Sequence, residues 1–111
     1  MNVGMSKKDI FNAKNASKDV KDAINAGQVL KVTGCAIVEN GATDRQGAPC
    51  DVGYIATNDG VFGFISNIMI ASLPDFAEIL AENLEAGEDT EIRFYAGTTK
   101  SGSEYYNFEI L

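Results

Sequence analysis

The sequence predicts a mainly β protein: a five-stranded Greek-key barrel with one long helix between the third and fourth strands and a short helix near the N-terminus. A chain of 111 residues is the size of one compact domain, and a hydrophobic fraction of 45% is ordinary for a chain that packs a core. Five segments alternate apolar and polar residues as strands do, and one long segment has the periodicity of an amphipathic helix. We therefore expect a single domain over residues 1–111, in which residues 1–27 form an N-terminal extension.

The first two elements are a short helix and a long strand. The helix is predicted in the segment 17–27, where Ser17 is a suitable N-cap and Gly27 a suitable stop. The strand follows over residues 28–39, and Gly34 predicts a bend in it. One face of this strand carries Leu30, Val32, Ala36 and Val38, and the other carries Lys31, Thr33, Cys35 and Glu39.

The other four strands are predicted as two hairpins. They cover residues 51–57, 60–66, 90–98 and 104–111. The first hairpin turns at Asp59-Gly60, and an Asp-Gly step is among the stronger hairpin signals in a sequence. The second turns at the sequence TKSGS. The segment ENGATDRQGAPC (39–50), before the first hairpin, is rich in Gly, Asp and Pro, and we expect a loop there.

The long helix is predicted between the third and fourth strands. Ser72 is its expected N-cap, Pro74 fits the first turn, and Gly87 is placed to end it. Its apolar stripe, spaced by three and four residues, consists of Leu73, Phe76, Ala77, Leu80 and Leu84. This order of elements is that of the OB-fold, a partly open five-stranded Greek-key barrel, with a small roll of the same strands as the alternative.

Charge is distributed unevenly along the chain. Nine Lys and Arg against sixteen Asp and Glu give a net charge of -7, which offers no overall attraction to phosphate or anionic lipid. Residues 1–31 hold six lysines and three aspartates, whereas residues 73–91 hold seven carboxylates and no basic side chain. Any nucleic acid would therefore be bound locally, away from the acidic helix.

The composition argues against the common catalytic and metal sites. The chain has no histidine, so the commonest general base and imidazole ligand are absent. Cys35 and Cys50 lack the Cys-x-x-Cys spacing and predict free thiols in a reducing compartment. No apolar window approaches the roughly 20 residues that span a bilayer. We expect a soluble, cytoplasmic protein that is not an enzyme and holds no metal and no cofactor.

Six Phe and four Tyr residues fall mostly in the predicted strands. Unpaired bases stack on aromatic side chains for about 1–3 kcal/mol each, so rings beside cations indicate a surface for single-stranded nucleic acid, although core packing is the alternative for any one ring. Alternation places Arg93 and Tyr95 together on the outer face of the fourth strand, and Tyr105 on that of the fifth. Tyr54 and Phe62 are further candidates. Alternation leaves core and groove both open for Tyr54, Phe62 and Phe64.

Four cations are the candidates for phosphate contacts: Lys31, Arg45, Arg93 and Lys100. Lys31 lies on the polar side of the first strand, and Arg45 lies in the loop that follows it. Lys100 lies at the tip of the last hairpin, where OB-folds commonly hold their ligand. Each of the four, taken alone, is also explained as a solubilising surface charge.

Several short motifs are similar to those of a known family. The run IATNDGVFGFIS is followed by the amphipathic helix and then by IRFYAGTTKSGSEYYNFEIL. In this respect the chain resembles the small single-stranded-DNA-binding proteins of tailed phages of Gram-positive bacteria. The matching positions are Thr57, Gly60, Ser66, Lys100, Ser101, Gly102 and the strand from Tyr105 to Leu111. The resemblance implies an OB-like domain that coats unpaired DNA during phage replication in the host cytoplasm, without a catalytic step.

The function predicted from the sequence is non-enzymatic binding of single-stranded DNA with little sequence preference. The exposed edge of the last strand could pair with a second copy of the chain, so the sequence allows a homodimer. An alternative is an acidic interaction protein whose carboxylates in residues 75–91 imitate DNA and inhibit a partner. An enzyme that uses Glu or Tyr alone is a further alternative, for which no acid, base and nucleophile can be named.

Overall fold

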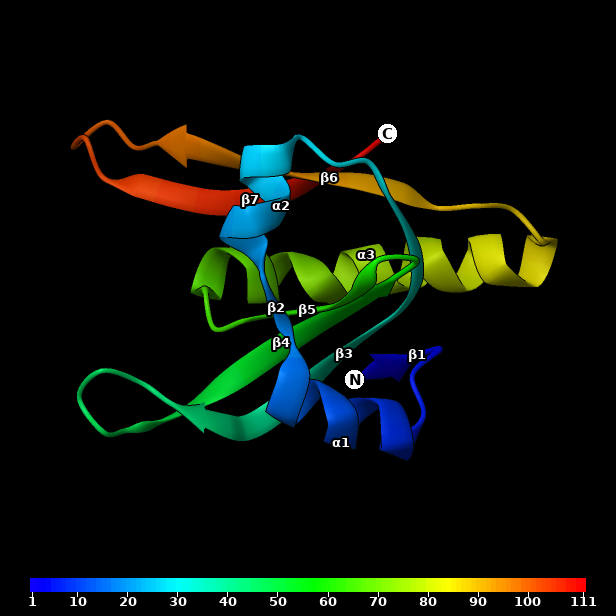
Figure 1. Ribbon diagram of the computed structural model, residues 1–111, viewed down its shortest axis with the longest axis horizontal. Helices are drawn as coiled ribbons and strands as arrows, with labels where there is room; N and C mark the ends of the chain where they lie inside the picture. The colour runs from blue at the N-terminus through cyan, green and yellow to red at the C-terminus, as the bar shows by residue number, and fades with distance from the viewer.

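The computed structural model describes all 111 residues, and its strands form one curled mixed sheet, a half-barrel, accompanied by three helices (Figure 1). The long strands are β3 (Leu30–Thr43), β4 (Pro49–Thr57), β5 (Gly60–Phe64), β6 (Glu91–Thr98) and β7 (Glu104–Ile110). Two short strands are β1 (Asn2–Val3) and β2 (Lys18–Asp19), and the helices are α1 (Lys7–Ala16), α2 (Val20–Ala26) and α3 (Asn67–Ala86). The prediction of a mainly β protein is confirmed.

The strand order is β2-β5-β4-β3-β6-β7, and β1 pairs with β3 beside this path. All pairs are antiparallel except β2 with β5, which is parallel and places Lys18 opposite Phe62. Strand β2, and not β7, therefore lies along the outer edge of β5. The N-terminal extension thus supplies one end of the sheet, and β7 is the other end.

Helix α3 lies between two parts of the sheet, with β6 and β7 on one side and β3 and β4 on the other (Figure 1). The main core fills this space. It contains Val20, Ala23, Leu30, Val32, Cys35, Ile55, Phe62, Phe64, Met69, Leu73, Phe76, Ala77, Leu80, Ile92 and Phe94. A second group, which we name the α1 cluster, contains Met5, Ala13, Ala36, Val52 and Tyr54 and lies on the opposite face of β3 and β4. Both faces of the β3–β4–β5 sheet are therefore covered.

A bulge in β3 changes the predicted division of its two faces. The register with β4 shifts between Val32 and Gly34, so Cys35 faces the main core and Ala36 faces the α1 cluster. The sequence alternation, carried unbroken through Gly34, placed these two residues wrongly. The shift falls at a close approach, because a Cβ at Gly34 would lie 2.8 Å from Cγ of Met5. Glycine is needed where the N-terminal segment crosses the strand.

The predicted loop over residues 39–50 is mostly strand. Strands β3 and β4 continue through it and turn only at residues 44–48, where Asp44 Oδ1 accepts hydrogen bonds from the backbone amides of Gln46 and Ala48. A second register shift follows Val38, and the next residues include Asn40 with a φ of +52°. Gly and Asn in this segment therefore form a bulge, although their composition is typical of a loop.

Helix α3 begins six residues earlier than predicted. Its N-cap is Ser66, whereas Ser72 lies inside the helix and donates from Oγ to the carbonyl of Ile68 at 3.2 Å. Pro74 lies in the helix interior and not in its first turn. The end is as predicted, since Gly87 adopts the left-handed conformation and its N–H bonds the carbonyls of Asn83 and Leu84. Leu84, expected in the apolar stripe, is 44% exposed.

The N-terminal extension contains two helices where one was predicted. Helix α2 ends at Gly27 as expected, but its N-cap is Asp19 and not Ser17. Helix α1 was not predicted, although Ser6 and Asp9 form a capping box and the spacing Ser-x-x-Asp indicates one in the sequence. Asp59 in the β4–β5 turn binds the extension and the residue directly after it: it pairs with Lys18 Nζ at 3.3 Å and accepts a hydrogen bond from Gln28 Nε2 at 3.0 Å. The hydrogen bond from Gln28 lowers the pKa of Asp59 most, and the hydrogen bond and charge of Lys18 lower it further.

Candidate nucleic-acid interface

The β6–β7 hairpin has one face on the main core and one face outside it. Ile92 and Phe94 point into the core and are almost fully buried. On the outer face the cross-strand pairs are Arg93 with Glu109, Tyr95 with Asn107, and Gly97 with Tyr105. Tyr95 and Tyr105 are half-buried and lie on adjacent pairs of the same face. The structure thus brings Arg93, Tyr95 and Tyr105 together, as alternation indicated.

The ring of Tyr105 passes over the backbone of Gly97. A Cβ at Gly97 would lie 2.8 Å from Cε1 of Tyr105, closer than real Cβ atoms come to a neighbour. The phenol ring therefore occupies the place that a side chain at position 97 would take, and it rests against β6. Gly97 is the residue that the sequence reasoning missed, and an aromatic residue opposite a glycine in a predicted hairpin was the signal for it.

Two of the predicted phosphate contacts are engaged in exposed ion pairs. Arg93 donates from Nη2 and Nε to Oε1 of Glu109, at 2.9 and 3.2 Å. Lys31 Nζ lies 3.4 Å from Asp89 Oδ2. Exposed ion pairs contribute only about 0–1 kcal/mol, so either cation can exchange its carboxylate for a phosphate at small cost.

The other two cations, Arg45 and Lys100, are exposed at hairpin tips and make no ion pair. The tip that carries Lys100 is well ordered by its own hydrogen bonds. The amide of Gly102 donates to the carbonyl of Thr99 at 3.0 Å, and the amide of Ser103 donates to Thr99 Oγ1 at 3.1 Å. Lys100 is therefore presented on a defined turn of the same hairpin as Tyr105.

Tyr54 and Phe62 are not available to a base. Tyr54 is 4% exposed within the α1 cluster, and burial raises the pKa of its hydroxyl. Phe62 is 1% exposed in the main core, where its ring centroid lies 5.2 Å from that of Phe94. Phe64 belongs to the same core. The predicted stacking roles of Tyr54 and Phe62 are corrected, because helices cover both faces of their sheet.

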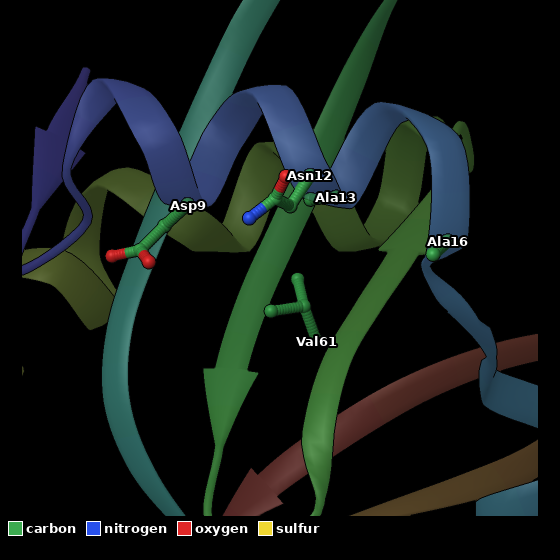
Figure 2. Close-up of a pocket in the computed structure, with 5 residues that line it drawn as sticks. All are labelled: Asp9, Asn12, Ala13, Ala16 and Val61. Atoms are coloured by element: carbon green, nitrogen blue, oxygen red, sulfur yellow. The ribbon is translucent and has the colours of Figure 1, made fainter.

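The surface has two hollows. One, of about 260 Å³, lies between α1 and β5, and Figure 2 shows Asp9 and Asn12 projecting from α1 on the side of Val61. It offers a carboxylate and no cation, so it does not suit a phosphate. The other, of about 360 Å³, is lined by Asp44, Arg45, Gln46 and Ile65. Arg45 and the apolar residue Ile65 both line it.

No three Cys, Asp or Glu side chains gather as the ligands of a metal ion would, and none of the three helices is long and apolar enough to cross a membrane. The fold and the site define a small mainly β protein whose last hairpin presents Tyr95, Tyr105 and Arg93 on its outer face and Lys100 at its tip. Comparisons with protein-family models, curated proteins and solved structures give no match for this chain.

Proposed function

We propose that the protein binds single-stranded DNA, with little sequence preference and no catalytic step, on the outer face of the β6–β7 hairpin. The observation that carries the proposal is the ring of Tyr105 held over Gly97, with Tyr95 beside it on the same face. Aromatic side chains that present a face to solvent next to cations are the usual device for holding unpaired bases. Arg93 and Lys100 supply the cations.

In this proposal bases stack on Tyr105 and Tyr95, while Arg93 exchanges Glu109 for a phosphate and Lys100 holds another. Stacking accepts every base because every base has a π face, so preference among sequences is slight. Each phosphate engaged steepens the fall of affinity with salt, by about 0.7 in the logarithmic slope for a single strand.

The position of α3 supports this assignment despite the net charge of -7. Helix α3 packs against the core face of the hairpin, where the rings of Phe76 and Phe108 lie with centroids 5.1 Å apart. The proposed binding face is the opposite one. The carboxylates of α3 are thus separated from the bound strand by the sheet itself.

The fold we propose for this function is an OB-like domain. The five long strands run in the order β5-β4-β3-β6-β7, and α3 connects the third of them in the chain to the fourth. Strand β2 takes the closing position beside β5. The outer edge of β7 is unpaired within the chain, and we propose it as the edge through which a homodimer would form.

The test is a fluorescence-anisotropy titration with oligothymidylate at low salt, repeated with duplex DNA and with oligouridylate. We expect preferential binding of single strands, and about tenfold weaker binding for Tyr105→Ala and for Tyr95→Ala. Tyr106→Phe, on the core face of the same strand, is the matched control and should bind like the parent. An absence of binding at low salt rejects the proposal. If the protein instead captures a host enzyme through α3, it belongs to the alternative class of acidic inhibitors.

A further inference from the structure

The solvent face of α1 has a composition that its packing does not explain. Phe11 is 67% exposed, the most exposed of the large hydrophobic side chains in the chain. Ala13 points to the sheet and is buried, and at 3.6 residues per turn Phe11 lies on the opposite side of the helix. The ring therefore stands in the middle of the solvent face and contributes little to the α1 cluster.

Lysines surround this ring. Lys7 and Lys8 lie one turn before Phe11, and Lys14 lies one turn after it, so all three are its neighbours on the helix surface. All three are exposed, and none forms an ion pair. Lysine stems that flank an aromatic ring keep their ammonium groups in water around it.

The one carboxylate of α1 does not neutralise this group. Asp9 projects on the side of Val61, as Figure 2 shows, and its Oδ2 accepts the backbone N–H of Ser6 at 3.0 Å. The backbone hydrogen bond with Ser6 lowers the pKa of Asp9 most, followed by the side-chain hydrogen bond with Ser6, and the charge of Lys8 lowers it further. The solvent face around Phe11 therefore carries three lysines and no carboxylate.

The cationic face lies in the only strongly basic part of the sequence. Residues 1–31 carry six of the nine cations, whereas residues 73–91 carry seven carboxylates and no base. In Figure 1 α1, β2 and α2 follow one another along the side of the molecule nearest the viewer. A polyanion that approaches this acidic protein is attracted first to that side.

We propose that Phe11, Lys7, Lys8 and Lys14 form a second contact for single-stranded DNA, in which a base stacks on Phe11 and the lysines hold the flanking phosphates. A protein occupant of ordinary composition is less favoured, because three unpaired ammonium groups around the ring select a polyanion. The inference rests on the proposed function and extends its footprint from the β6–β7 hairpin to the N-terminal extension. Helix α1 covers one face of the β3–β4–β5 sheet, so that sheet face cannot bind DNA. In this proposal the solvent face of α1 binds it instead.

A unique tryptophan tests the proposal directly, because the chain has none. Phe11→Trp keeps a stacking ring, and its fluorescence should be quenched on addition of oligothymidylate. Ile79→Trp is the matched control, since Ile79 is 40% exposed on the acidic helix α3 and should show no quenching. Phe11→Ala should weaken binding about tenfold. Lys7→Gln, Lys8→Gln and Lys14→Gln together should reduce the logarithmic salt slope by about 2, and the three Arg replacements should restore it.

The outcomes separate this inference from the proposed function. Anisotropy that reports binding, with no quenching of Phe11→Trp and no change of salt slope, overturns the contact on α1 and leaves the hairpin site standing. An absence of binding by the parent protein overturns both. A blue shift of Phe11→Trp with vesicles of anionic phospholipid, and none with oligothymidylate, assigns the face to a lipid surface and overturns the inference.

Discussion

The β3–β4–β5 sheet and the β6–β7 hairpin both contain aromatic strands, yet they use their rings differently. The first has the main core on one face and α1 on the other, and it buries Tyr54 and Phe62. The second has a core on one face only and leaves Tyr95 and Tyr105 half-exposed. The difference shows that the number of covering layers, and not the type of residue, decides whether a strand aromatic is core or surface.

The largest expected effect is on the doubly covered sheet. Phe62→Ala removes a ring that is 1% exposed, and we expect the free energy of unfolding to fall by about 3–5 kcal/mol, as for other large core truncations. Urea denaturation measures this. Tyr95→Ala, on the hairpin that is covered on one face only, should lower the free energy of unfolding far less. Equal losses of unfolding free energy in the two variants would contradict the proposed difference between the two regions.

The next effect is the dependence of stability on alkaline pH through Cys35. Burial raises the pKa of this thiol to about 11, whereas the unfolded chain ionises near 9. The folded state binds the proton more tightly, so stability is fully present below pH 9 and declines as the pH rises towards 11, by up to about 3 kcal/mol. Cys35→Ala should remove this part of the decline in urea unfolding. A decline of the same depth in that variant would disprove the assignment.

A charge placed under α1 should open the covered face of the sheet. Ala13→Asp buries a carboxylate at a position that is 3% exposed, and we expect a loss of about 1–3 kcal/mol as α1 detaches. Because burial is what raises the pKa of Tyr54, that pKa should fall towards its ordinary value, as followed by phenolate absorbance. Asn15→Asp, on the solvent face of α1, is the control and should leave Tyr54 unchanged.

A smaller effect is expected on the open face of the hairpin. Gly97→Val puts a side chain where the ring of Tyr105 lies, and the displaced ring should weaken binding of oligothymidylate about tenfold while the fold is kept. Ala96→Val, one residue away on the other face, should bind normally. Anisotropy gives the affinities and circular dichroism the fold. Unchanged affinity in Gly97→Val would remove the central support for the hairpin site.

The smallest effect concerns the ion pair on the same face. Arg93 and Glu109 are each 47% exposed, so Glu109→Gln should change the free energy of unfolding by less than about 1 kcal/mol. It should also strengthen binding of oligothymidylate, because Arg93 is then free to contact phosphate. Asp89→Asn, which frees Lys31 opposite Glu91 on the same outer face but further from Tyr95 than Arg93 is, serves as the comparison. Weaker binding by Glu109→Gln would show that Arg93 needs its carboxylate partner.

Local signals were sufficient for much of this fold. The Asp59-Gly60 turn, the end of α3 at Gly87 and the shared outer face of Arg93 and Tyr95 are each fixed by neighbouring residues, and the structure has them as predicted. The start of α3 was misplaced because Ser72 and Pro74 form a good helix start locally. The burial of Met69, which lies before the predicted start, outweighs that preference, and the helix begins at Asn67.

The failures at the site have a common physical cause. Whether Tyr54 is accessible depends on α1, which lies more than 35 residues away in the sequence and reaches the sheet only in the folded state. The switch of faces at Gly34 likewise lies where Met5, far from it in the sequence, approaches the strand closely. Periodicity within one strand contains no information on what a distant segment will cover. The sequence alone could therefore not decide whether the aromatic side chains of the β3–β4–β5 sheet are buried or exposed.

The parallel pairing of β2 with β5 has a consequence for biosynthesis. Lys18 and Asp19 leave the ribosome well before Phe62 and Gly63, the residues with which they pair. A helix of ten residues such as α1 is too short to be stable alone in water, so the N-terminal segment has no folded state of its own in that interval. The N-terminal segment is therefore synthesised first but folds only after β5 has been synthesised.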